Sequence, residues 1–563
     1  MKKIDKISNL KEKKTILNLK KELYLDEKDF ELDKEGRVVK LELLGRWFEI
    51  APKVIGKLTH LEELDLHNYD YYYPPDDVDS KIGNLENLSQ LKKLNLHFNF
   101  LKKIEGLDNL SNLRELDLHM NKIKKLEGLE TLHNLNHLDL SQNYIEKIEG
   151  LENLTQLKTL EIRFNQIKKI EGLETLTQLK TLDFMHNKIT KIEGLENLHN
   201  LEKLDLFGSV IKKIEGLEKL TQLKKLVLYG EEIKKIEGLD SLTNLEILYL
   251  YGNKIEKIEG LDTLSKLQHL SFNKNKIKKI EGLDELYHLE GINISENEII
   301  TIEGLDNLKK LQKLDLSRNK IKEIKGLNGL IQLEDLNLSN NHIVKITGPL
   351  NLSKLKKLNT NNNQIKKIEG LENLLQLQEL NLSKNEITKI MGLDSLSQLT
   401  NLNLDHNLIF KIEGLENLSK LQNLILSNNK IAKIEGLNNL VKLKKLMLIS
   451  NLISKIEGLE NLSQLDILVL SFNQIRKLEG LDKLIHLTHL SLNYNPLDAE
   501  DQKIIKEDIK KIISHYKKRK IKWLIKKMEL LKAKSKLEGL QLEDYKSLEK
   551  EIEKISKEIK DFE

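Results

Sequence analysis

One spacing dominates this chain: an asparagine in the pattern Leu-x-Leu-x-x-Asn-x-Ile-x-Lys-Ile-Glu-Gly-Leu returns every 22 residues. Between Asn99 and Asn495 this period provides 19 positions, which we call ladder positions, and 17 of them hold asparagine. The exceptions are Ser209 and Glu231. A glycine stands seven residues after each of the first 18 ladder positions. So strict a period means that one short unit repeats and that neighbouring units stack on each other.

The residues of one unit indicate what the unit folds into. Alternating leucines such as Leu116 and Leu118 have the spacing of a strand with one buried face. Asparagine carries donors and an acceptor on one side chain, so when buried it can satisfy backbone groups of its own unit and of the next. The glycine predicts a tight turn with positive φ or a close backbone approach. The short return path leaves no room for a long helix, and we expect extended or 3₁₀ segments there.

This pattern resembles the leucine-rich repeat (LRR), and within it the 22-residue subclass typified by the nuclear regulatory subunit of protein phosphatase-1. Asn121-Lys122-Ile123-Lys124-Lys125-Leu126-Glu127-Gly128-Leu129 is one example. The resemblance implies an α/β repeat fold: a right-handed solenoid with a concave parallel β-sheet and a short 3₁₀ or extended convex side. It also implies a scaffold that binds another protein on the concave face and has no chemistry of its own.

The period sets the expected domain boundaries. Two less regular units around Leu41-Glu42-Leu43 and Leu64-Asp65-Leu66 precede the array, so we expect a solenoid of about 21 coils over residues 39–498. Extra residues at 69–77 predict a loop on the edge of the array. Terminal coils expose leucines that have no neighbour and need caps.

Both ends of the chain are therefore predicted to be helical. Residues 1–38 are expected to form an N-terminal helical cap over the first coil. Residues 499–563 are expected to form a C-terminal helical cap and a coiled-coil-like hairpin, with Asp498 as N-cap of the first helix. The charge of this tail changes along its length: residues 500–536 hold 14 basic and 5 acidic residues, and residues 537–563 hold 5 basic and 9 acidic residues.

The final helix has a spacing that needs a partner. Its apolar residues are spaced 3-4-3-4-3, which predicts a coiled-coil seam too short to be stable alone: Tyr545, Leu548, Ile552, Ile555, Ile559 and Phe562. Three partners stay open. The first is an antiparallel hairpin whose other seam is Ile521, Leu524, Ile525, Met528 and Leu531. The second is a homodimer or a partner-docking helix, and the third is a basic amphipathic surface for acidic membrane or nucleic acid.

Solvent-facing positions of the predicted strands point to a candidate binding surface. The column four residues before each ladder position is acidic in successive coils: Asp117, Asp139, Glu161, Asp183 and Asp205. Like charges on adjacent strands repel modestly, a cost that suits a surface for a basic partner. The alternative is that aspartate is the default residue of this column, copied by duplication, and Asp315 supports that alternative.

An aromatic patch is predicted beside the acidic column. It consists of Met185, His186, Phe207, Tyr229, Tyr249 and Tyr251, accompanied by Val227 and Ile247, which we expect to face solvent on four successive strands. The same coils contain Ser209 and Glu231, the two exceptions in the asparagine pattern. Exposed aromatic clusters usually mark contact sites. The alternative is drift in repeats that were duplicated together.

Composition excludes several other classes of function. Lys plus Arg is 92 and Asp plus Glu is 88, so the net charge of +4 favours neither nucleic acid nor membrane. There is no cysteine, no signal-peptide pattern and no long apolar run, and we expect a soluble cytoplasmic protein. His97 and His119 with Asp117 could form a weak zinc site, but exposed histidines are common on such sheets, and we predict no metal and no cofactor. No catalytic motif occurs, and we predict no enzyme activity.

The leading hypothesis is a non-enzymatic scaffold that binds a protein partner on its concave face through the acidic column and the aromatic patch. One alternative is a structural or adaptor protein whose C-terminal helices bind a partner or form a homodimer. Another is a regulatory subunit of a phosphatase or a GTPase.

Overall fold

The computed structural model describes most of the chain, namely residues 3–44, 52–68, 81–230, 232–346, 350–481, 483–484, 486–505, 509–534 and 542–562. The edge loop predicted at 69–77 lies outside these residues. The chain divides into two compact units. Unit 1 comprises Met1–Ile299 with Glu303–Leu311, and unit 2 comprises Ile300–Ile302 with Gln312–Glu563.

The N-terminal cap of unit 1 is a helix with a β-hairpin. Its elements are η1 (Lys3–Lys6), α1 (Leu10–Leu23), β1 (Phe30–Leu32) and β2 (Val38–Glu42). Strand β1 pairs antiparallel with β2, the first strand of the solenoid. The expectation that residues 1–38 are helical was therefore wrong for β1, because an antiparallel strand satisfies the backbone groups on the open edge of the sheet, which a helix does not do.

Helix α1 is held to the first coils by apolar packing and one buried carboxylate. Asn9 caps the helix by accepting from the backbone N–H of Lys11 at 2.9 Å. The buried Glu12 accepts from the N–H of Val38 at 2.9 Å and lies 2.7 Å from Nδ1 of His60. A buried carboxylate with two such partners is satisfied and fixes the position of α1 against the sheet edge.

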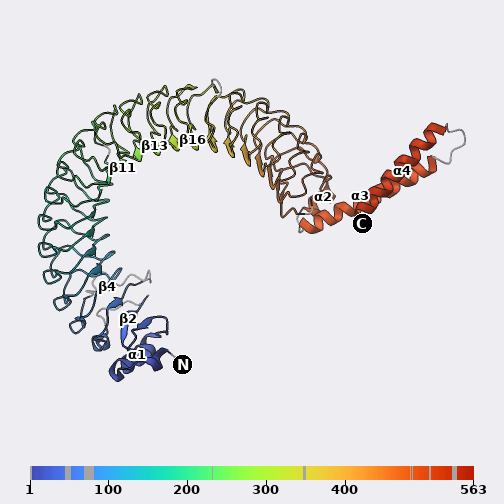
Figure 1. Cartoon of the computed structure of the whole chain (residues 1–563). Coiled ribbons are helices and arrows are strands. Elements are labelled where there is room, and N and C mark those ends of the chain that lie inside the picture. The colour runs from blue at the N-terminus through green and yellow to red at the C-terminus, as the bar shows by residue number, and fades with distance from the viewer. Residues whose placement is uncertain are drawn as a thin grey trace. The chain divides into compact units, whose positions relative to one another are not determined.

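The remaining strands of unit 1 are parallel and short. They are β3 (Glu63–Asp65), β4 (Lys93–Asn95), β5 (Glu115–Asp117), β6 (His137–Asp139), β7 (Thr159–Glu161), β8 (Thr181–Asp183), β9 (Lys203–Asp205), β10 (Lys225–Val227), β11 (Ile247–Tyr249), β12 (His269–Ser271) and β13 (Gly291–Asn293). Leu41 pairs with Leu64 and Leu64 with Leu94, and from there each partner lies 22 residues on. Figure 1 shows the strands β4 and β11 on the inner side of the coils and the return segments on the outer side.

The ladder asparagines bond neighbouring coils together, as the sequence predicts. In the coil of Asn143, the side-chain Nδ2 donates to the carbonyls of Leu118 and Leu140, both at 3.0 Å. Its Oδ1 accepts from the N–H of Ile123 in the preceding coil at 2.9 Å. Asn143 is only 4% exposed, so the bonds it makes replace water at backbone groups of two coils.

The glycines and the return path also follow their predicted chemistry. Gly128 has φ +81°, and a Cβ at this residue would lie 2.3 Å from the carbonyl oxygen of Ile104 in the preceding coil. On the return side, the N–H of Leu154 bonds to the carbonyl of Leu151 and that of Leu157 to Leu154, both at 2.9 Å. These are successive turns of 3₁₀ type, and a 3₁₀ helix proper, η2, forms at Lys53–Lys57.

Unit 2 continues the same coil pattern. Its strands are β14 (Lys313–Asp315), β16 (Asp335–Asn337), β18 (Lys357–Asn359), β19 (Glu379–Asn381), β20 (Asn401–Asn403), β21 (Asn423–Ile425), β22 (Lys445–Met447), β23 (Ile467–Val469) and β24 (His489–Ser491). Two further short strands, β15 (Glu323–Ile324) and β17 (Lys345–Ile346), pair in parallel with each other away from the main sheet. Within each unit, the coils thus stack as a solenoid of parallel strands, and each unit has a helical terminal segment, as predicted.

Three helices follow the last coil of unit 2: α2 (Ala499–Ile504), α3 (Ile509–Lys534) and α4 (Leu542–Phe562). Asp498 caps α2 by accepting from the N–H of Asp501, as predicted. The side chain of Asp501 is fully buried and accepts from the N–H of Leu478 at 2.7 Å. Helix α2 therefore closes the last coil through a buried carboxylate, which parallels Glu12 at the other end of the chain.

Helices α3 and α4 pack against each other along apolar seams (Figure 1). Leu524 and Ile555 are buried at the centre of this contact, and Lys527 pairs with Glu551 at 3.0 Å. Ile525, which the sequence placed in the seam, is 39% exposed, because residues 521, 524, 528 and 531 follow a 3-4-3 spacing that leaves residue 525 beside the contact. Among the described helices, none is long and apolar enough to cross a membrane.

Candidate functional site

The predicted acidic column lies at the ends of five adjacent strands of unit 1. Asp117, Asp139, Glu161, Asp183 and Asp205 are the last residues of β5 to β9 and pair in register with one another. Burial of Asp205 raises its pKa, because a partly buried carboxylate is poorly solvated in its charged form. The pKa of Glu161 is also raised, first by burial and then by the charge of Asp139. These shifts are what closely spaced carboxylates produce.

A basic residue that the sequence reasoning missed neutralises the middle of this column. Arg163 pairs with Glu161 at 2.6 Å and with Asp183 at 2.7 Å. It stands two residues after Glu161, so its guanidinium reaches a carboxylate of its own coil and one of the next coil. At one end of the column, hydrogen bonds from His119 outweigh burial and hold the pKa of Asp117 below its usual value. The column therefore contains carboxylates paired with Arg163 or His119 as well as carboxylates without a basic partner among the described residues, and it is not a uniform acidic strip.

The aromatic residues form a continuous row of ring contacts, in which His186 meets Phe207 edge to face at 77°, and we call this row the aromatic ladder. It runs through five successive coils and consists of Phe164, His186, Phe207, Tyr229 and Tyr251. Its ring centroids lie 4.5, 4.7, 4.8 and 4.9 Å apart from one ring to the next. Ring separations of this size give favourable aromatic contacts.

The exposure of this patch differs from the expectation that every member faces solvent. Val227 is buried at 4%, and Phe207, Tyr229 and Tyr251 are half-buried, because each ring covers its neighbour. Burial raises the pKa of the Tyr251 hydroxyl to about 12. The surface offers the outer faces and edges of stacked rings, so it is smaller and stiffer than separately exposed rings would be.

The other members of the predicted patch border the aromatic ladder. Met185 and Tyr249 are half-buried, and Tyr249 pairs in register with Val227 at the end of β11. Phe164, which is 43% exposed, is a member that the sequence reasoning missed. Phe164 and His186 hold the position just before a ladder position, and both have positive φ, at 51° and 53°. Their backbone conformation turns the rings toward the neighbouring coil.

Two glycines make room for the rings. A Cβ at Gly252 would lie 1.9 Å from the ring of Tyr229, and a Cβ at Gly208 would lie 2.6 Å from Nδ1 of His186. Between these glycines, the hydroxyl of Ser209 is buried and has no hydrogen-bond partner. The rings, these two glycines and Ser209, which is one of the two exceptions in the asparagine pattern, therefore occur together in one stretch of unit 1.

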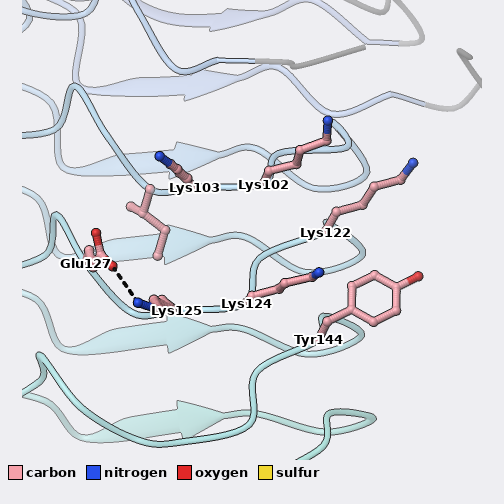
Figure 2. Close-up of a pocket in the computed structure, with 8 residues that line it drawn as sticks. Lys102, Lys103, Lys122, Lys124, Lys125, Glu127 and Tyr144 are labelled. Atoms are coloured by element: carbon pink, nitrogen blue, oxygen red, sulfur yellow. Dashed lines mark ion pairs between the residues drawn. The ribbon is translucent and has the colours of Figure 1, made fainter. Parts of the chain in front are cut away.

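A second feature of unit 1 is a basic groove on the segments that follow Asn99, Asn121 and Asn143. Its volume is about 590 Å³, and its lining comprises Lys102, Lys103, Ile104, Lys122, Lys124, Lys125, Glu127 and Tyr144. Figure 2 shows the lysine side chains and the Tyr144 ring projecting from successive coils, with Lys125 paired to Glu127. The sequence reasoning did not single out these lysines, because lysine recurs at these positions in most coils. The groove is a positively charged surface apart from the acidic column.

Comparisons with known proteins agree with this geometry. A family model described as leucine-rich repeats in two copies matches residues 111–153, 155–197, 177–219, 243–285, 287–329, 331–373 and 419–461. No curated protein sequence matches the chain. An LRR protein of Leptospira interrogans is similar in structure, with a TM-score of 0.53 and 23% identity over 76% of this chain and 96% of that chain.

Two further solved structures are similar. The plant peptide hormone receptor RGFR1 in complex with RGF2 has a TM-score of 0.51 and 20% identity over 80% of this chain and 81% of that chain. An internalin of Listeria monocytogenes has a TM-score of 0.46 and 30% identity over 56% of this chain and 88% of that chain. The repeat matches, the ladder asparagines and the stacked parallel coils together show that this chain belongs to the leucine-rich repeat proteins.

Proposed function

We propose that this protein is a non-enzymatic scaffold that binds a protein partner on the strand face of unit 1, with the aromatic ladder as the anchor. The observation that carries the proposal is the row of five rings in contact across successive coils, for which Gly208 and Gly252 leave room. A pre-stacked aromatic surface loses little side-chain entropy on binding, and aromatic residues supply much of the energy at interfaces. LRR solenoids are typically protein-interaction scaffolds, which supports this assignment.

The chemistry of the surface indicates what kind of partner fits. Ring faces attract apolar and cationic groups, and Lys274 already lies 5.9 Å above the ring of Tyr229. Carboxylates lie next to the aromatic ladder. For example, Asp205 is the last residue of β9 and stands two residues before Phe207. We therefore expect a segment of a protein that combines basic and apolar side chains. The receptor RGFR1, which has the same fold, is described in complex with the peptide RGF2.

The test compares partner capture by three full-length proteins. They are the wild type, the ladder variant Phe207→Ser/Tyr229→Ser/Tyr251→Ser, and the control variant Phe472→Ser/Tyr494→Ser. The control removes a stacked ring pair of unit 2, whose centroids lie 4.2 Å apart. All three must first show equal circular dichroism and melting.

A captured protein is then purified and its binding is measured directly. Loss of the anchor predicts binding at least about tenfold weaker for the ladder variant, and near wild-type binding for the control. Equal binding by the wild type and the ladder variant would contradict the proposal.

The main alternative places partner binding or homodimerisation on the C-terminal helices. The observation in its favour is the length of α3 and α4, which extend well beyond the helix that caps the last coil. Truncation after residue 517 separates the two proposals, because it leaves Asp501 and Ile512, both buried, in place. The scaffold proposal predicts unchanged partner binding after truncation. The adaptor proposal predicts loss of binding, or a change from dimer to monomer by light scattering, while the solenoid stays folded.

A role as regulatory subunit of a phosphatase or a GTPase is a narrower form of the scaffold proposal. It rests on the resemblance of the repeats to the 22-residue subclass, and it is supported if the captured partner is such an enzyme. Cytoplasmic location likewise remains a prediction from the sequence, which fractionation of cells with an antibody against the protein would check.

A further inference from the structure

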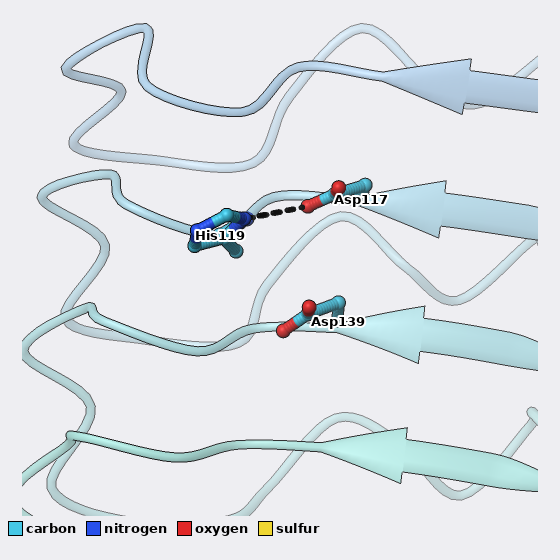
Figure 3. Close-up of side chains that lie close together, drawn as sticks. All are labelled: Asp117, His119 and Asp139. Carbon is cyan, nitrogen blue, oxygen red and sulfur yellow. Dashed lines mark hydrogen bonds and ion pairs between the residues drawn. The ribbon is translucent and has the colours of Figure 1, made fainter. Parts of the chain in front are cut away.

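Three potential metal ligands converge at the ends of β5 and β6, at one end of the acidic column. Asp117, His119 and Asp139 each offer one ligand atom, and these atoms all lie within 4.8 Å of one another (Figure 3). Asp117 and Asp139 pair in register on adjacent strands, so their carboxylates repel each other. His119 follows two residues after Asp117, with its Nδ1 at 3.6 Å from the Asp117 carboxylate.

Backbone hydrogen bonds hold both carboxylates in position. Oδ1 of Asp117 accepts from the N–H of His119 at 2.9 Å, and Oδ1 of Asp139 accepts from the N–H of Ser141 at 2.8 Å. In each aspartate, the hydrogen bond to Oδ1 comes from the backbone of the same coil. This bond fixes the orientation of the whole carboxylate, including Oδ2. Ligands whose orientation is already fixed lose less entropy on binding a metal.

A second imidazole lies directly beside the cluster. The ring of His97, one coil earlier, stacks on the ring of His119 with centroids 3.9 Å apart and planes 15° apart. Further along the column, the residue equivalent to His119 is Ser141, then Arg163, and then a methionine. Among the five coils of the acidic column, the one that carries Asp117 therefore has a histidine, His119, at this position, next to the carboxylates of Asp117 and Asp139.

In place of the prediction of no metal made from the sequence, we propose that Asp117, His119 and Asp139 bind a divalent transition metal ion, with Zn²⁺ as the best fit and a fourth position open to water. Mixed imidazole and carboxylate donors suit Zn²⁺, whereas Ca²⁺ and Mg²⁺ are bound by oxygen ligands. Zinc ligands lie about 2.0–2.2 Å from the metal. The three ligand side chains are half-buried, and a bound cation would offset the repulsion between the two carboxylates. This inference is independent of the partner proposal.

The test is Zn²⁺ binding by the full-length protein without a histidine tag. The protein is stripped with chelator, titrated with Zn²⁺ by calorimetry, and the bound metal is counted after dialysis. We expect one equivalent of Zn²⁺ and a saturable affinity tighter than about 100 µM. His119→Ala and Asp139→Asn should each weaken binding by at least about tenfold.

The matched control is His269→Ala. His269 also projects from a strand of unit 1, but its register neighbours are Ile247 and Gly291 instead of carboxylates. Its loss should leave the Zn²⁺ affinity unchanged. Melting in chelator, with and without each substitution, shows that a variant is folded.

Two results would overturn the proposal. One is the absence of saturable binding by the wild type, and the other is an affinity of His119→Ala equal to that of His269→Ala. As an independent readout, Co²⁺ in place of Zn²⁺ should give visible absorption typical of a four-coordinate site in the wild type and in His269→Ala, and none in His119→Ala.

Discussion

The ladder asparagines allow a stability change to be worked out bond by bond, and Asn407 of unit 2 provides the test. Its Nδ2 donates to the carbonyls of Leu382 and Leu404 at 3.0 and 3.1 Å, and its Oδ1 accepts from the N–H of Ile387 at 3.0 Å. Asn407 is 5% exposed. In the variant Asn407→Ala, water cannot easily replace these bonds.

The two carbonyls and the N–H are affected differently by this substitution. Leu382 keeps a bond from Asn385, and Leu404 keeps a bond from Asn429, so each carbonyl still has a donor. The N–H of Ile387 loses the acceptor that Asn407 provided and becomes a buried donor without a partner, which costs about 1–3 kcal/mol. With a smaller loss for the two shared bonds, we expect the free energy of unfolding to fall by about 2–4 kcal/mol.

The assay is urea unfolding combined with hydrogen exchange, because a repeat protein need not unfold in a single step. Exchange should accelerate most at amides of the coils around residues 382–409. The control is Asn417→Ala, whose exposed side chain donates one bond of 3.1 Å to the carbonyl of Asp394 and should cost less than about 0.5 kcal/mol. Equal stability of the Asn407→Ala and Asn417→Ala proteins would refute the reasoning.

Three further predictions follow from single residues. Gly128→Ala should lower the free energy of unfolding by about 2 kcal/mol or more, because alanine is strained at φ +81° and its Cβ would overlap a carbonyl of the preceding coil. A loss below about 0.5 kcal/mol, measured by urea unfolding, would contradict this and would mean that the coils move apart easily. Hydrogen bonds from Lys224 and Lys180 lower the pKa of Glu202 from 4.5 to about 2. These ion pairs therefore stabilise the fold above pH 4.5, and the stabilisation is lost as the pH falls toward 2. Titration of the Glu202 carboxyl near pH 4.5, measured by NMR, would contradict this. Ultraviolet titration should show a tyrosine that ionises near pH 12, and this step should disappear in Tyr251→Phe.

The sequence was sufficient for the features that each coil makes for itself. The ladder asparagines, the positive φ of Gly128 and the i to i+3 turns at Leu154 follow from residue chemistry within a 22-residue period. The strand β1 was missed because it is three residues long and its role depends on the edge that it covers. The resemblance to one subclass of LRR protein was more specific than the comparisons support.

The candidate site was predictable only in part, because it depends on which neighbour a side chain turns toward. The acidic column could be placed from spacing, but the two ion pairs of Arg163 require knowledge of its rotamer. Phe207 and Tyr229 are half-buried, and this could not be predicted, because the 22-residue period does not show that rings of neighbouring coils contact each other. Phe164 carries a signal that could have found it, namely an aromatic residue just before a ladder position, next to a coil with the same feature.

The sharing of carbonyls between consecutive asparagines has a consequence for how such a chain changes in evolution. Because every coil presents the same donors and acceptors to the coil before it and the coil after it, removing 22 residues joins two surfaces that already match. Within one unit, a deletion or duplication of one repeat therefore moves two surface features closer or farther apart by one strand spacing, about 4.8 Å, without rebuilding either. The distance between two binding features of one unit can then change during evolution only in steps of one strand spacing.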